Sequence, residues 1–122
     1  AQLDRWEIVT SLNYLSLERE MEIILSKNKK LNNPKGKEKV SNMIKVASLT
    51  RKGFIAGDIS TVMSPRTVLN WCGNSEIFKD TGYAFRITFL NKCDDSEKGT
   101  IAEYYQRCFG EDLPESMINI QI

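Results

Sequence analysis

One arginine beside an expected helix start is the residue whose type and position best suit chemistry. Ser64, Pro65 and Arg66 form a helix-start signature, with serine as the N-cap and proline at the first helical position. A cation there opposes the helix macrodipole by roughly 0.3–1 kcal/mol, so it makes most sense where an anion binds. Free backbone N–H groups and a guanidinium together suit phosphate oxygens. The alternative is that Arg66 points into solvent or pairs with a nearby acid.

Other reaction chemistries find little support. Histidine is absent, which excludes Ser-His-Asp and Cys-His catalysis, HExxH zinc sites and histidine pH switches. Cys72, Cys93 and Cys108 form no Cys-x-x-Cys pair, so we expect reduced, buried thiols; a single disulfide is the alternative. The acidic residues Asp94, Asp95 and Glu97 suit a helix N-terminus better than a metal site, and no metal ligands are predicted.

Composition indicates one globular domain that positions these residues. The 122 residues are 41% apolar and 27% charged, with a net charge of +1. No apolar run approaches the length of a membrane span, so no membrane contact is expected, and the odd, widely spaced cysteines indicate a cytoplasmic protein. Six lysines crowd residues 27–39, which read as a mobile loop because the segment also holds Asn, Pro and Gly. Nucleic-acid binding through this loop is disfavoured, since no aromatic residues interleave the lysines.

Capping residues and apolar spacing predict a mostly α fold. A strand over residues 6–15, rich in β-branched and aromatic residues, is expected to precede a bundle of about five helices. The strand has no partner in the sequence, so we expect a fragment of a larger protein. The helices are expected to start at Ser16, after the lysine loop, at Ser64, at Asp80 and at residues 94–96.

Some details of these helices stay open. The second helix is expected to end near Gly53 and Gly57, the third to break or bend near Gly73, and the last to close at Gly110. Residues 84–90 suit either a helix or a strand.

Several segments together resemble a known family. AQLDRW followed by IVTSLNYL, then MSPRTVLNW, then EIFKDTGYAFRITFLNKCDDSEKGTIAEYYQRCFGEDLPES resemble the C-terminal part of the ATPase subunit of aerobic cobaltochelatases. That subunit is a MoxR-like AAA+ ATPase with some bacteriophage relatives. The match covers nearly the whole chain and is densest over residues 62–116, while the lysine segment does not match.

The resemblance implies two domains and two arginine roles. Residues 1–15 would end the AAA+ core, and residues 16–122 would form the helical lid. Arg5 falls on the arginine-finger position, and Arg66 falls on the sensor-2 position, with Ser64 beside it at the nucleotide. Positioned guanidinium groups of this kind stabilise charge on a transferring phosphoryl group.

The resemblance also implies an incomplete site. The sequence holds neither a GxxxxGK[ST] motif nor an acidic Walker B motif, so it is not expected to hydrolyse ATP alone. ATP and Mg²⁺ would be cofactors of the parent subunit, whose partners would be neighbouring subunits of an AAA+ ring and other chelatase subunits. ATP turnover there would drive cobalt insertion into a corrin ring. The alternative is a non-catalytic helical protein-interaction module.

Overall fold

The structure, a computed structural model, describes residues 7–9 and 16–110, and most of these residues are helical. Five α-helices and two short 3-10 helices lie between residues 16 and 110: α2 (Leu17–Lys27), η1 (Lys29–Leu31), α3 (Pro34–Ala56), α4 (Pro65–Phe78), α5 (Thr81–Thr88), η2 (Leu90–Lys92) and α6 (Asp95–Phe109). The mostly α fold class is therefore confirmed for the described residues.

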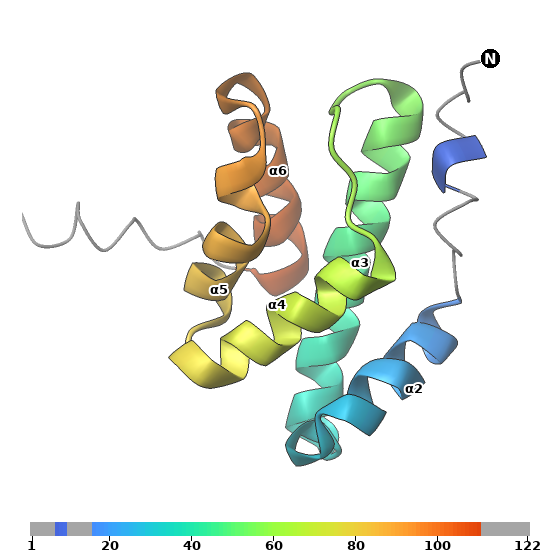
Figure 1. Ribbon diagram of the computed structural model, residues 1–122, viewed down its shortest axis with the longest axis vertical. Helices are drawn as coiled ribbons and strands as arrows, with labels where there is room; N and C mark the ends of the chain where they lie inside the picture. Colours follow the sequence, from blue (N-terminus) through green and yellow to red (C-terminus); the bar gives the residue numbers. More distant parts are fainter. Residues whose placement is uncertain (1–6, 10–15, 111–122) are drawn as a thin grey trace, which may run out of the picture.

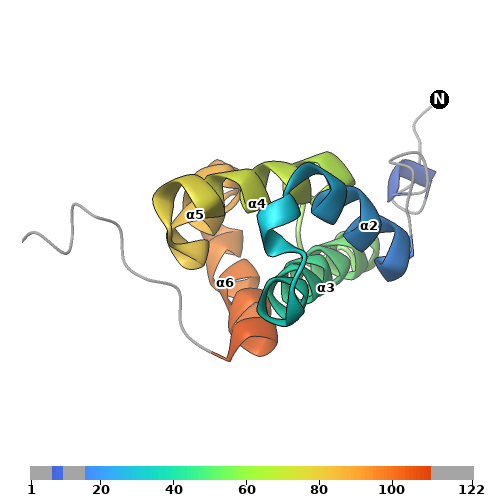
Figure 2. The ribbon, with the colours of Figure 1, turned by 90° about the horizontal axis from the view of Figure 1, so that it is seen from below.

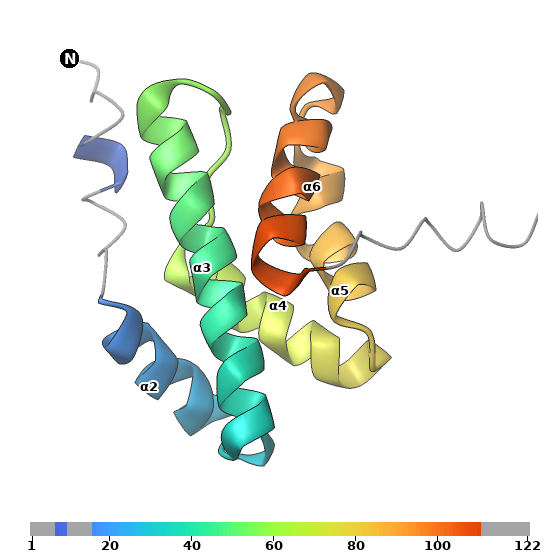
Figure 3. The same ribbon diagram turned by 180° about the vertical axis from the view of Figure 1, so that it is seen from behind.

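The long helix α3 is the centre of the bundle. It contacts α2 on one side and α6 on the other, and α4 crosses it at an angle (Figure 1). Seen from below, α4 and α5 lie along one side of the molecule, and α3 lies along the other (Figure 2). From behind, α3 and α6 are side by side, with α4 crossing behind α3 (Figure 3). No helix of the described segments is long and apolar enough to cross a bilayer.

Side-chain caps start the helices where the sequence predicts them. The side chains of Ser16, Ser64 and Asp80 each accept a backbone N–H from the first turn of the helix that follows. Gly57 and Gly110 close α3 and α6 in the left-handed conformation, at φ 87° and 71°. These predicted helix starts and ends are confirmed.

The predicted N-terminal strand is not observed. Of residues 6–15, the structure describes only 7–9, and these form a helical turn whose Val9 side chain is buried in the core. No strand exists among the described residues to pair with this segment, so a helical turn is what satisfies its backbone locally.

The predicted lysine loop is also wrong in most of its length. Asn33 accepts the Gly36 N–H at 2.8 Å, and Pro34 opens α3, so residues 34–39 are helical. Gly36 lies so close to the preceding turn that a Cβ there would be 2.1 Å from the Leu31 carbonyl oxygen. The Asn-Pro start repeats the Ser-Pro start of α4, but the surrounding lysines obscure it in the sequence.

Two other uncertainties are resolved by the structure. The helix α4 continues through Gly73 to Phe78, so the predicted break is wrong. Residues 84–88 are helical and residues 90–92 form a 3-10 turn, which excludes the strand alternative for 84–90. One glycine costs a helix only about 1 kcal/mol, less than the burial of Trp71 and Cys72 in the same turns can offset.

Aromatic side chains from α4, α5 and α6 fill one half of the core. Trp71 lies 4.8 Å from Phe85 and 6.3 Å from Tyr105, measured between ring centroids, and its indole N–H donates to the Thr81 carbonyl. The aromatic residues of these helices are thus mainly core, although Phe78 is 47% exposed. All three cysteines are free thiols, which agrees with the prediction of reduced thiols, but only Cys72 and Cys93 are buried as predicted and Cys108 is half-buried.

Candidate functional site

The guanidinium of Arg66 is available to a ligand at the start of α4. Arg66 is exposed, and no hydrogen bond or ion pair within residues 16–110 engages its side chain. In the same turn the Thr67 N–H donates to the Ser64 hydroxyl, and the Val68 N–H donates to the Ser64 carbonyl. Because Pro65 has no N–H, the backbone N–H of Arg66 is the remaining donor of this turn, and it has no partner in the described part of the chain.

This arrangement suits an anion. Arg66 lies at the positive end of the α4 dipole, and its backbone N–H and its guanidinium are both unpaired in the described part of the chain. All three features favour the binding of negative charge. The possibility that Arg66 pairs with a neighbouring acid is not observed among the described residues. Exposure therefore leaves either solvent or a ligand as its partner.

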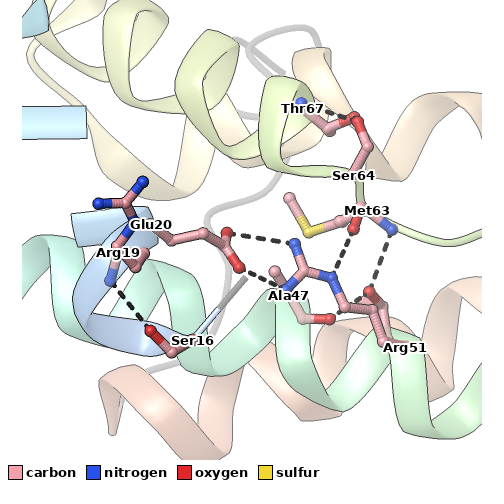
Figure 4. A network of polar contacts seen from close by, with 9 residues as sticks. Ser16, Arg19, Glu20, Ala47, Arg51, Met63, Ser64 and Thr67 are labelled. Carbon is pink, nitrogen blue, oxygen red and sulfur yellow. Dashed lines mark hydrogen bonds and ion pairs between the residues drawn. The ribbon is translucent and has the colours of Figure 1, made fainter. Parts of the chain in front are cut away.

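Two hydrogen bonds from α3 hold the backbone just before α4, and both are made with the peptide groups of Met63. The Met63 N–H donates to the Thr50 hydroxyl at 3.2 Å, and the Met63 carbonyl accepts from the Arg51 Nε at 2.9 Å. Thr50, Arg51 and Met63 are all buried. Figure 4 shows these contacts converging beside Ser64. We call this pair of bonds the Met63 clamp.

A buried ion pair fixes the arginine of the Met63 clamp. Arg51 of α3 donates to both carboxylate oxygens of Glu20 in α2, at 2.6 and 3.2 Å (Figure 4). The two side chains are 4% and 1% exposed, so the pair is withdrawn from water. Charge-assisted, bidentate geometry of this kind constrains both partners strongly. One network therefore connects α2, α3 and the first turn of α4.

The predicted site residues have different outcomes. Arg5 lies outside the described residues. Ser64 is at the expected place, but its hydroxyl serves as the helix cap and lies 3.0 Å from the Thr67 hydroxyl. Arg66 is at the exposed helix start that the Ser-Pro-Arg signature predicts. The roles of all three in nucleotide chemistry stay predictions.

Sequence reasoning missed the supporting network. Arg51 follows Ala47 by four residues and precedes Phe54 by three, so it lies on the apolar face of α3. A cation on a buried helical face needs a buried anion, which was the available signal. Its partner Glu20 is 31 residues away, and no local pattern connects the two.

A separate basic corner surrounds η1. The exposed lysines here are Lys27, Lys29, Lys30, Lys35 and Lys37. Lys39 pairs with Glu76 of α4 at 3.5 Å. A surface hollow of about 430 Å³ is lined by Ser26, Lys27, Asn28, Lys29, Lys30 and Glu76. The lysines are displayed on an ordered corner, because the amides of Asn28 and Asn33 bond to the Ile24 and Lys30 carbonyls.

Comparison with known proteins gives one relevant similarity. The chain is 56% identical over 120 residues to aerobic cobaltochelatase subunit CobS of Sinorhizobium sp. The similar region covers 98% of this chain and 36% of that protein, so the chain spans about a third of its relative's length. No protein-family model and no solved structure matches the chain. The resemblance to a cobaltochelatase subunit predicted from the sequence is confirmed, because the chain is similar to one part of CobS over nearly all of its own length.

Proposed function

We propose that the chain is the helical lid of a cobaltochelatase-type AAA+ ATPase subunit and that Arg66 contacts the phosphates of the nucleotide. The observation that carries the proposal is the free guanidinium and the free N–H of Arg66 at the start of α4. Identity of 56% to a cobaltochelatase subunit supports the choice of subunit class. The Ser-Pro-Arg helix start supports the sensor-2 assignment.

In this proposal the chain supplies charge stabilisation rather than the whole reaction. ATP hydrolysis places growing negative charge on the phosphoryl oxygens, and Arg66 with the α4 dipole would hold that charge. Arg5 would act as the arginine finger toward a neighbouring subunit's nucleotide. The phosphate-cradling and Mg²⁺-binding motifs, which this sequence lacks, would come from elsewhere in the subunit. Turnover in a ring with the other chelatase subunits would drive cobalt insertion into a corrin ring.

Arg66→Ala in the complete subunit, assembled with its partner subunits, tests the proposal. We expect ATP turnover to fall by at least tenfold, because charge-stabilising arginines contribute that much or more. We expect stability to stay equal or rise by about 0.3–1 kcal/mol, since the variant removes a cation from a helix N-terminus. Turnover by phosphate release and unfolding in urea are the two measurements.

Arg19→Ala is the matched control. Arg19 lies in the first turn of α2, is exposed, and forms only a 3.8 Å pair with Glu22 whose two side chains are both 70% exposed. The control makes the same charge change in the first turn of another helix, one position further from the cap, so turnover should not change. Wild-type turnover in Arg66→Ala would contradict the proposal and favour the interaction module. The exposed Ile77 and Phe78 at the end of α4 would then be the first surface to test.

A further inference from the structure

The buried ion pair between Glu20 and Arg51 is energetically expensive, and it lies next to the start of α4. Removing two charges from water carries a penalty that their attraction often does not repay, so a buried ion pair is weak evidence for stability. The side chains of Glu20 and Arg51 are 1% and 4% exposed, and the Nε of Arg51 also donates a hydrogen bond to the backbone carbonyl of Met63. The pair therefore determines geometry at Met63, whatever its net stability.

The geometry at Met63 fixes where α4 starts. Met63 directly precedes the cap residue Ser64, and the clamp holds both its N–H and its carbonyl. These two bonds leave little freedom for the peptide planes on either side of Met63. The two bonds therefore fix the first turn of α4, with Arg66 two residues past the cap, relative to α3.

We propose that Thr50, Arg51 and Glu20 are positioning residues that set the location of Arg66 at the nucleotide. The inference rests on the proposed function of Arg66 and names the residues of this chain through which that function is achieved. A misplacement of about 1 Å at a catalytic group can cost on the order of a hundredfold in rate. Loss of the Met63 clamp therefore reduces turnover without touching a residue that contacts the nucleotide.

Thr50→Val in the complete, assembled subunit is the sharpest perturbation. Valine keeps the shape of threonine but removes the hydroxyl that accepts the Met63 N–H and donates to the Ala47 carbonyl at 2.7 Å. Thr50→Ser keeps the hydroxyl and is the conservative variant. Ile101→Val removes one buried carbon in α6, away from the clamp, and controls for a general loss of stability. Turnover is measured at a temperature where urea unfolding shows every variant to be folded.

A double-mutant cycle with Arg66→Lys separates positioning from structural damage. We expect Thr50→Val to lower turnover by about tenfold in the wild-type background. Thr50→Ser is expected to restore most of the turnover, and Ile101→Val to retain it. In the Arg66→Lys background the loss of turnover caused by Thr50→Val should shrink to less than about threefold, because lysine lacks the planar guanidinium whose position matters.

Different outcomes overturn different statements. Folded Thr50→Val with wild-type turnover overturns the positioning role, as does an equal cost of Thr50→Val in both backgrounds. If Arg66→Ala and Arg66→Lys both keep wild-type turnover, the proposed function of Arg66 fails first, whatever Thr50→Val does. A loss of turnover in the Arg66 variants but not in Thr50→Val leaves the proposed function standing and removes only the positioning residues.

Discussion

Replacing Gly36 by alanine places a methyl group where the preceding turn already lies. The added Cβ would be 2.1 Å from the Leu31 carbonyl oxygen and 2.6 Å from both the Leu31 carbonyl carbon and Cα. All three are backbone atoms, so relief requires η1 and the start of α3 to separate by about 1 Å. Overpacking of this kind costs about 1–3 kcal/mol.

The same substitution also has a favourable component, which a second variant measures. Alanine is up to about 1 kcal/mol better than glycine inside a helix. Gly73 in α4 has no atom within 4 Å of an added Cβ, so Gly73→Ala shows the helical gain alone. The difference between the two variants then gives the cost of the Leu31 contact at about 1–3 kcal/mol, or a little less if the gain at the helix start is smaller.

Urea unfolding of the chain, followed by circular dichroism at the helical band, measures both variants. We expect Gly36→Ala to be less stable than the wild type and Gly73→Ala to be equal or more stable. On heating, the two midpoints should differ by several degrees, since 1 kcal/mol corresponds to about 4 °C in a domain of this size. Equal stability of the two variants would refute the close packing of η1 on α3.

The cysteines give two further predictions. Burial raises the pKa of the Cys72 thiol to about 11 and also raises those of Cys93 and Cys108. Alkylation of the folded chain by iodoacetamide should therefore be slow and should modify the half-buried Cys108 first, with Cys72 and Cys93 reacting only in denaturant; mass spectrometry of the peptides would show a different order if this burial is wrong. The raised pKa of Cys72 also means that the unfolded chain loses this proton first, so stability should fall as pH rises from about 9 to about 11, and Cys72→Ala should have a shallower slope in pH-dependent urea unfolding.

The helix starts and ends were predictable because their signals are local. The side chains of Ser64 and Asp80 accept backbone N–H groups three residues further on, and Pro65 suits the first helical position. Gly110 supplies a left-handed closure that other residues adopt at a cost. The start of α3 has an equally local signal in Asn33-Pro34. The surrounding lysines obscure this signal, because a basic segment that also holds Asn, Pro and Gly is typical of a mobile loop.

The network of the candidate site was not predictable in the same way. Glu20 and Arg51 are ordinary surface residues by composition, and only the packing of α2 against α3 brings them together. Arg66 could be singled out because its position against the helix dipole is a local anomaly. The residues that hold it in place have no such local anomaly, apart from a cation on an apolar face.

The connector between α3 and α4 is hydrogen-bonded to α6 near its start and to α3 near its end. Glu97 in the first turn of α6 accepts the Ser60 N–H at 2.9 Å and lies 3.1 Å from the Ser60 hydroxyl, while the Met63 clamp holds the other end to α3. These contacts restrain the connector at both ends, so we expect any displacement of Arg66 to carry α3 and α6 with it. Under the proposed nucleotide role of Arg66, distance changes should accordingly appear between the helical bundle and the rest of the subunit, and not between the helices of the bundle.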